Sequence, residues 1–171
     1  MSKNYFALLG LDPQFDVDAT VLHQRYVEAQ QVLNQENARA TSSLERMECA
    51  QKIADLNTGY GCLKEDIARA YHLLFLAEGQ HFDEDGVTFQ DPQVLQEILD
   101  LHEAMSDADS VQKQSLMRQL TDRLHVCFAD LKNAFESYDR DHVLTHLRRY
   151  SYFIKAQKDF EAQLQPLDRA C

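Results

Sequence analysis

Apolar residues recur at steps of three and four along most of the chain, the spacing that predicts amphipathic helices. The first such stripe follows Asp18, a residue suited to cap a helix, and consists of Ala19, Leu22, Tyr26, Ala29 and Leu33. The second follows a capping-box pair, Ser42 and Glu45, and consists of Cys49, Ile53, Leu56, Tyr60 and Leu63. Two such stripes predict an antiparallel helical hairpin, with the polar stretch VLNQENARATSS at residues 32–43 as its loop.

Shorter helices are predicted on both sides of this hairpin. One covers residues 5–9 and ends at Gly10 and Pro13, and the other covers residues 67–76 and stops near Gly79. Residues 79–91, GQHFDEDGVTFQD, differ from both, because they hold two glycines, four acids and no sustained helical period. This composition predicts a linker.

Three longer helices are predicted beyond the linker. The first starts at Asp91-Pro92, a cap followed by proline in the first turn, and runs to about residue 106. The second covers about residues 110–136, and the third starts near Asp139 and Asp141. Each carries one apolar face, so together they predict a three-helix bundle. The predicted organisation is therefore all-α, with parts at residues 1–78 and 92–171 joined by the linker at 79–91.

Composition supports this fold class and narrows the function. The chain has 171 residues, of which 44% are apolar and 26% charged, with only 5 Gly and 3 Pro, a balance typical of a helical globular protein. The formal net charge of −11 argues against a nucleic-acid partner, because affinity for a phosphate backbone depends on clustered Lys and Arg. An acidic surface is more often simply a soluble one.

The amino-terminal stretch and the cysteines bear on localisation. MSKNYFALLGLDPQ has one Lys and a very short apolar run, which predicts neither a signal peptide nor a membrane span. The four cysteines lie far apart and show no C-x-x-C spacing, so they predict reduced thiols and neither a zinc site nor a disulfide framework. We therefore expect a cytoplasmic protein with no membrane partner.

Known catalytic and metal-binding motifs are missing from the sequence. It contains no Gly-rich phosphate loop, no G-x-S-x-G and no H-E-x-x-H. His142 and His146 share one helix face near Asp141 and are the best candidates for metal ligands. Such pairs are far more often solvated or core-edge histidines, so we expect no metal, no cofactor and no enzymatic activity.

A set of motifs in order makes the chain recognisable. The run LNTGYGCLKEDIARAYHLLFLAEG at residues 56–79 follows Tyr5-Phe6 and LLGL at residues 8–11, and within it stand Asn57, Tyr60, Leu63, Arg69-Ala70 and the Leu73-Leu74-x-Leu76 run. Together these resemble the J-domain of the HscB family of iron–sulfur co-chaperones, and the resemblance extends through nearly all of the chain. It implies an amino-terminal J-domain and a carboxyl-terminal three-helix domain in an L shape. The first would recruit a DnaK-type chaperone (HscA) and stimulate its ATPase, and the second would bind the cluster scaffold protein IscU.

The chaperone-docking residues depart from the family pattern. J-domains carry His-Pro-Asp between their second and third helices, and this chain has Asn34, Gln35 and Glu36 at those positions. Asn34 cannot become cationic, and Gln35 lacks the fixed φ of proline. The basic face expected on the second helix is reduced to Arg25 and His23, offset by Glu28. We therefore hypothesise weak or absent stimulation of the chaperone ATPase, with a compensated, still-active variant as the alternative.

The resemblance also implies a scaffold-binding surface on the first helix after the linker. Its residues are Leu95, Gln96, Leu99, Asp100, Glu103, Asp107 and, on the last helix, Tyr152, with Gln96 departing from an apolar family position. The polar members step by four, three and four along one helix face. Periodicity alone favours the core for the two leucines and a solvated face for the acids.

The sequence thus predicts a non-enzymatic adaptor that links an IscU-type scaffold to an HscA-like chaperone. The alternative is a helical interaction protein with a J-domain fold that binds a partner without engaging a chaperone.

Overall fold

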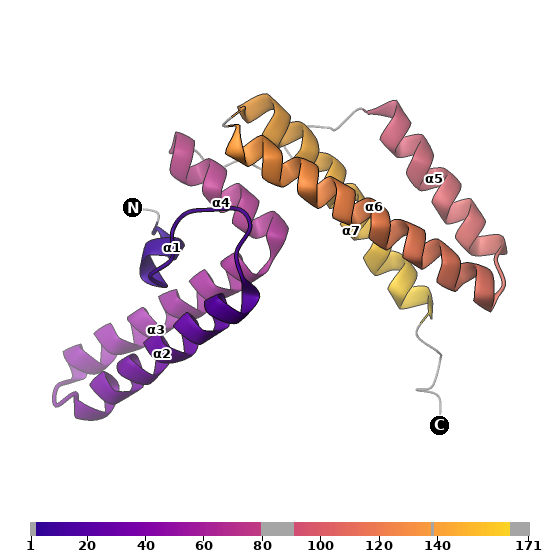
Figure 1. Ribbon diagram of the computed structural model, residues 1–171. Coiled ribbons are helices and arrows are strands. Elements are labelled where there is room, and N and C mark those ends of the chain that lie inside the picture. Colours follow the sequence, from indigo (N-terminus) through magenta and orange to yellow (C-terminus); the bar gives the residue numbers. More distant parts are fainter. Residues whose placement is uncertain (1–2, 80–90, 138, 165–171) are drawn as a thin grey trace, which may run out of the picture. The chain divides into compact units, whose positions relative to one another are not determined.

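The computed structural model describes residues 3–79, 91–137 and 139–164, and its regular elements there are all helices (Figure 1). Internal contacts divide the chain into two compact units, Met1–Glu84 and Asp85–Cys171. The predicted all-α class, with a helical hairpin followed by a three-helix bundle, is confirmed. The predicted linker lies outside the described residues except for Gly79 and Asp91.

The first unit is built on a helical hairpin. α1 (Tyr5–Leu8) precedes α2 (Ala19–Arg39) and α3 (Ser43–Lys64), which lie side by side, and α4 (Asp66–Glu78) follows (Figure 1). Both predicted caps form. Asp18 accepts hydrogen bonds from the amides of Val21 and Thr20, which lower the pKa of its carboxyl. Glu45 closes a capping box with Ser42, and the amides of Ser42 and Thr41 lower its pKa in the same way.

The loop of this hairpin is much shorter than the sequence predicted. α2 continues to Arg39, so only residues 40–42 connect it to α3, and the expected loop at 32–43 is wrong. Residues 34–39 contain no Gly or Pro, and Gln, Glu, Ala and Arg favour a helix, so nothing ends α2 until Ala40 takes an extended conformation. The three positions predicted to correspond to the family's His-Pro-Asp motif, residues 34–36, are therefore helical in this chain.

Buried apolar residues of α1, its carboxyl-terminal cap, α2 and α3 form the core of the first unit, namely Phe6, Leu9, Leu22, Leu56 and Leu63. The buried Arg69 of α4 lies beside this core. Its guanidinium donates hydrogen bonds to the carbonyl oxygens of Phe15 and Leu63, both at 2.6 Å, and to the Asp66 carboxylate at 2.5 Å. These bonds satisfy a buried cation and fix the segment between α1 and α2.

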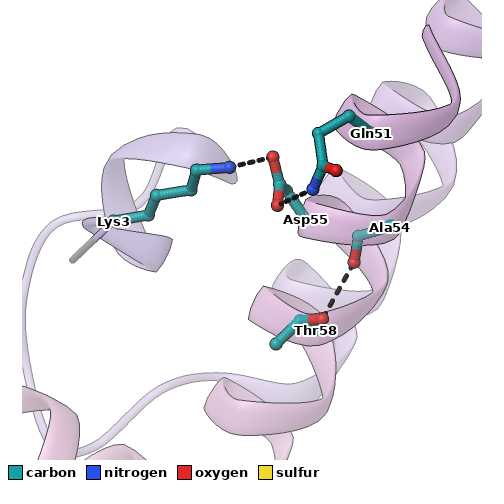
Figure 2. A network of polar contacts seen from close by, with 5 residues as sticks. All are labelled: Lys3, Gln51, Ala54, Asp55 and Thr58. Atoms are coloured by element: carbon teal, nitrogen blue, oxygen red, sulfur yellow. Dashed lines mark hydrogen bonds and ion pairs between the residues drawn. The ribbon is translucent and has the colours of Figure 1, made fainter. Parts of the chain in front are cut away.

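Polar contacts also tie the amino terminus to α3. The Lys3 ammonium bonds the Asp55 carboxylate, which accepts a second hydrogen bond from Gln51 Nε2 at 2.9 Å (Figure 2). The Lys3 contact is the main reason that the pKa of Asp55 lies below its usual value. A Cβ at Gly59 would lie 3.0 Å from the Tyr5 ring, so a glycine there lets α1 approach α3 closely.

The second unit contains α5 (Pro92–Asp107), α6 (Ser110–Glu136) and α7 (Arg140–Leu164). α6 and α7 lie side by side, and the contact between them is more extensive than the contact that α5 makes with either helix (Figure 1). Side chains with no exposed surface fill the interior, among them Leu120, Leu131, Leu147, Phe153 and Phe160. Asp91 caps α5 and Asp109 caps α6, each through two amide hydrogen bonds.

Candidate partner-binding surfaces

The three residues predicted to replace the family motif lie on the last two turns of α2. Asn34, Gln35 and Glu36 are all exposed there. Glu36 is paired with Lys52 of α3, with 3.4 Å between Lys52 Nζ and Glu36 Oε2. The one carboxylate of the three is thus partly neutralised by a cation within the same hairpin.

The remaining predicted docking residues are also paired within the hairpin. Arg25 lies 3.6 Å from Glu28 one turn later, measured from Nη1 to Oε2. His23 Nδ1 is 3.1 Å from the Tyr60 hydroxyl, beside the stacked rings of Tyr26 and Tyr60. α2 contains two arginines and two glutamates, so its charges cancel and it has no net basic face.

α5 presents its two predicted leucines to solvent. Leu95 is 38% exposed and Leu99 is 57% exposed, so the expectation from periodicity that they belong to the core is wrong. Val94 and Met105 fill the core side of this helix instead, each at most 2% exposed. The two leucines lie one helical turn apart and form a small apolar patch on this helix.

The polar members of the predicted surface lie on the same helix and are all exposed. Gln96 Nε2 donates to Asp100 Oδ1 at 2.8 Å, and Glu103 and Asp107 continue the row. α5 contains four carboxylates and no lysine or arginine. This helix therefore combines exposed apolar groups with charge of a single sign.

Tyr152, the last predicted member, lies on α7. It is half-buried, whereas its neighbour Phe153 is fully buried and points into the core. The two predicted sites belong to different units, with the docking residues in the first and the scaffold-binding residues in the second.

The structure adds a feature that the sequence analysis missed, a groove of about 870 Å³ between α5 and α6, here called the α5–α6 groove. Its walls come from both helices, and are Pro92, Gln93, Gln96, Glu97, Asp100, Leu101, Gln119, Leu120, Asp122, Arg123 and Val126. Val126 is 58% exposed. An apolar residue on the polar face of a predicted helix was the available signal in the sequence, but the groove itself requires the pairing of two helices.

The two candidate metal ligands, His142 and His146, both lie on α7, and His142 is exposed. The His142 and His146 rings lie 6.4 Å apart, and His142 Nδ1 is 3.3 Å from an Asp139 carboxylate oxygen. Within residues 3–79, 91–137 and 139–164, no three His, Cys, Asp or Glu side chains are grouped as a metal site would require. Burial raises the pKa of the Cys62 and Cys127 thiols, which lowers their reactivity. Among the described helices, none has the length and hydropathy needed to cross a membrane.

Comparisons with known proteins agree with this architecture. The family model described as "HSCB C-terminal oligomerisation domain" matches residues 90–161. A co-chaperone protein HscB homolog of Shewanella denitrificans is 29% identical over 164 residues, which cover 91% of this chain and 94% of the relative. The corresponding protein of Shewanella oneidensis is 32% identical over 120 residues, 70% of this chain and 68% of the relative.

A plant relative and a solved structure extend this comparison. An iron–sulfur cluster co-chaperone protein HscB homolog of Arabidopsis thaliana is 27% identical over 164 residues, which cover 95% of this chain and 64% of the relative. The crystal structure of human co-chaperone protein HscB matches with a TM-score of 0.86 at 22% identity. The match covers 97% of this chain and 84% of the human chain, so the two proteins share the fold. The fold is thus that of a J-domain co-chaperone. The chain belongs to the HscB family, as its sequence motifs predicted.

Proposed function

We propose that this protein binds an IscU-type iron–sulfur scaffold protein through α5 and brings it to a DnaK-type, HscA-like chaperone. The observation that carries the proposal is the exposure of Leu95 and Leu99 beside the carboxylates of α5. An apolar centre with a charged rim is the usual composition of a protein interface, and a row of carboxylates attracts a basic partner. The protein then acts as a non-enzymatic adaptor between these two partners.

The chaperone half of this function is expected to be weak. At the family motif positions the chain offers a neutral amide, a second amide and a carboxylate already paired with Lys52. Arg25, the remaining cation of the predicted docking set, is paired with Glu28. Both charges are already paired within the hairpin. A chaperone surface that binds such charges would have to compete with these pairs, which lowers its affinity for the protein.

The helical state of residues 34–36 favours a second candidate function. A J-domain loop can present its motif in a fixed bend, but here the three side chains point outward from successive positions of a regular helix. This arrangement supports a protein that binds a scaffold, or another partner, without entering a chaperone cycle.

Two measurements distinguish these functions. A single-turnover ATPase assay with the cognate DnaK-type chaperone measures docking, and we expect much less stimulation than by a J-domain protein with His-Pro-Asp. Titration of the full chain with the scaffold protein measures binding through α5. Equal ATPase stimulation would contradict the weak docking, and a scaffold that does not bind would contradict the adaptor function.

A pull-down from lysate gives an independent answer. Recovery of both scaffold and chaperone supports the adaptor, whereas recovery of the scaffold alone supports the second function.

A further inference from the structure

The α5–α6 groove combines an apolar floor with an acidic rim. Its lining includes three apolar side chains, Leu101 of α5 with the fully buried Leu120 and the 58% exposed Val126 of α6. Asp100 and Asp122 stand exposed on opposite walls. The groove can therefore accept an apolar side chain between two carboxylates.

The charges within the groove do not balance. Glu97 of α5 and Arg123 of α6 bridge it through an ion pair of 2.5 Å, so the one cation among its lining residues is already bonded. The two aspartates then leave the rim negative. A partner that enters is expected to carry a basic residue near its apolar one, because the opposite charge lowers the cost of desolvating these carboxylates.

Contacts with the two neighbouring helices define the flanks of α5. His102 packs its ring against Phe160 of α7, with 4.8 Å between ring centroids, whereas Glu97 bonds Arg123 of α6. Leu95 and Leu99 precede His102 by seven and three residues, which places them on the flank toward α7. Gln93 and Leu101 lie four residues from Glu97, on the flank toward α6.

Gln96 and Asp100 connect these two flanks. Both belong to the proposed scaffold-binding surface and both line the groove, and they are joined by their own hydrogen bond of 2.8 Å. A partner that covers the outer face of α5 therefore reaches the edge of the groove without a break in the surface.

We propose that the α5–α6 groove is a second part of the scaffold-binding surface, and that it takes an apolar side chain of the scaffold flanked by a basic residue. The scaffold then contacts α5 on both flanks, with the exposed leucines on the flank toward α7 and the groove on the flank toward α6. This inference rests on the proposed function and adds α6, through Val126 and Asp122, to the interface.

The test introduces a charge into the groove and the same charge elsewhere on α6. Val126→Glu places a carboxylate in the groove, and Val111→Glu is the matched control because Val111 is 76% exposed on the same helix and does not line the groove. In a calorimetric titration of the full chain with the IscU-type scaffold, we expect Val126→Glu to weaken binding at least about tenfold, a loss of about 1.4 kcal/mol. Val111→Glu is expected to bind like the wild type.

A second pair of variants keeps the test independent of how position 126 tolerates a charge. Asp122→Lys reverses a rim charge, and Glu136→Lys makes the same change at an exposed position near the end of α6, outside the groove. We expect Asp122→Lys to bind the scaffold more weakly than the wild type does, and Glu136→Lys to bind it like the wild type. Circular dichroism of each variant confirms its helical content.

The outcomes separate this inference from the function on which it rests. If Val126→Glu and Asp122→Lys bind like the wild type while Leu99→Ala binds more weakly, the groove is not part of the interface but the α5 surface remains. If the wild-type protein does not bind the scaffold, the proposed function fails and the groove proposal fails with it.

Discussion

α2 and α5 are both long surface helices of their units, and they differ in how their charges are arranged. On α2 the charges cancel, and three of its four charged residues have partners within the hairpin, because Arg25 pairs with Glu28 and Glu36 pairs with Lys52. On α5 all four charged residues are carboxylates, and a cation of a neighbouring helix pairs with one of them, Glu97. α2 therefore presents a nearly neutral surface, and α5 an acidic one.

This difference bears on the two binding activities that the family fold suggests. A helix with charge of one sign produces a field that steers an oppositely charged partner and raises its association rate. A helix whose charges are paired locally produces little field beyond the pairs themselves. Electrostatic steering thus favours binding at α5, whereas α2 offers a chaperone little beyond shape and a few apolar side chains.

Restoring the family motif in α2 gives the largest expected effect. The variant Asn34→His/Gln35→Pro/Glu36→Asp removes a helical N–H and places a proline ring in the last turns of α2, at a cost of up to about 3 kcal/mol. We expect α2 to end earlier and chaperone ATPase stimulation to increase, as measured by circular dichroism and single-turnover hydrolysis. The matched control carries Ala at position 35 in place of Pro and keeps the helix. Stimulation that stays at the wild-type level would show that other parts of the hairpin limit docking.

Removing the apolar groups of the proposed scaffold-binding surface has the next largest expected effect. Leu99→Ala combined with Tyr152→Ala is expected to weaken scaffold binding by about 2 kcal/mol or more, because truncated anchor residues leave their pockets unfilled. Isothermal titration with the folded variants measures this loss. Val111→Ala, another exposed aliphatic truncation in the same unit, is the control. Unchanged affinity of the double variant would remove both residues from the interface.

Neutralising the carboxylates of α5 is expected to act mainly on the association rate. Asp100→Asn/Glu103→Gln/Asp107→Asn should lower the affinity by about 1 kcal/mol and flatten its dependence on salt, because exposed rim charges act through steering. Stopped-flow association at two ionic strengths measures both effects. Glu136→Gln/Asp159→Asn/Glu161→Gln, on α6 and α7, is the control for total charge because it also removes three exposed carboxylates. An unchanged salt dependence would contradict the electrostatic role of α5.

Breaking the ion pair of the hairpin gives the smallest effect. Glu36→Gln or Lys52→Gln should change the free energy of unfolding by less than about 1 kcal/mol, because both partners are exposed to solvent. Urea denaturation of the two single variants and the double variant isolates the coupling between the residues. If Lys52→Gln alone restored ATPase stimulation, the pair itself, and not the replaced motif, would be what suppresses docking.

The sequence predicted most of the helices because the signals that place them are local. Asp18, the Ser42–Glu45 capping box and Asp91-Pro92 are read within one helical turn, and the structure forms each of these caps. The prediction of where α2 ends was wrong because it, too, depended on local signals alone. Residues 34–39 resembled a loop by their polarity, yet they contain no residue that stops a helix, and a polar helix face is as acceptable as a polar loop.

The exposure of the residues proposed to bind the scaffold could be read only from the tertiary structure. Periodicity shows that Leu95 and Leu99 lie near an apolar face, but only the packing of α5 on α6 and α7 leaves them at the surface. Tyr152 is similar, because its half-buried position follows from Phe153 taking the core site. The family resemblance selected Leu95 and Leu99 as surface groups, and the structure exposes both, where periodicity alone favoured the core.

By itself, then, the sequence determined the all-helical class, the order of the helices, their caps and membership of the HscB family, since all of these depend on spacings and motifs along the chain. Only the tertiary structure decided which charges are neutralised and where a groove opens. Lys52 meets Glu36, and Arg123 meets Glu97, across helices that the sequence separates by 16 and 26 residues. Such contacts depend on how two helices are rotated and set against one another, which a pattern within either helix does not specify.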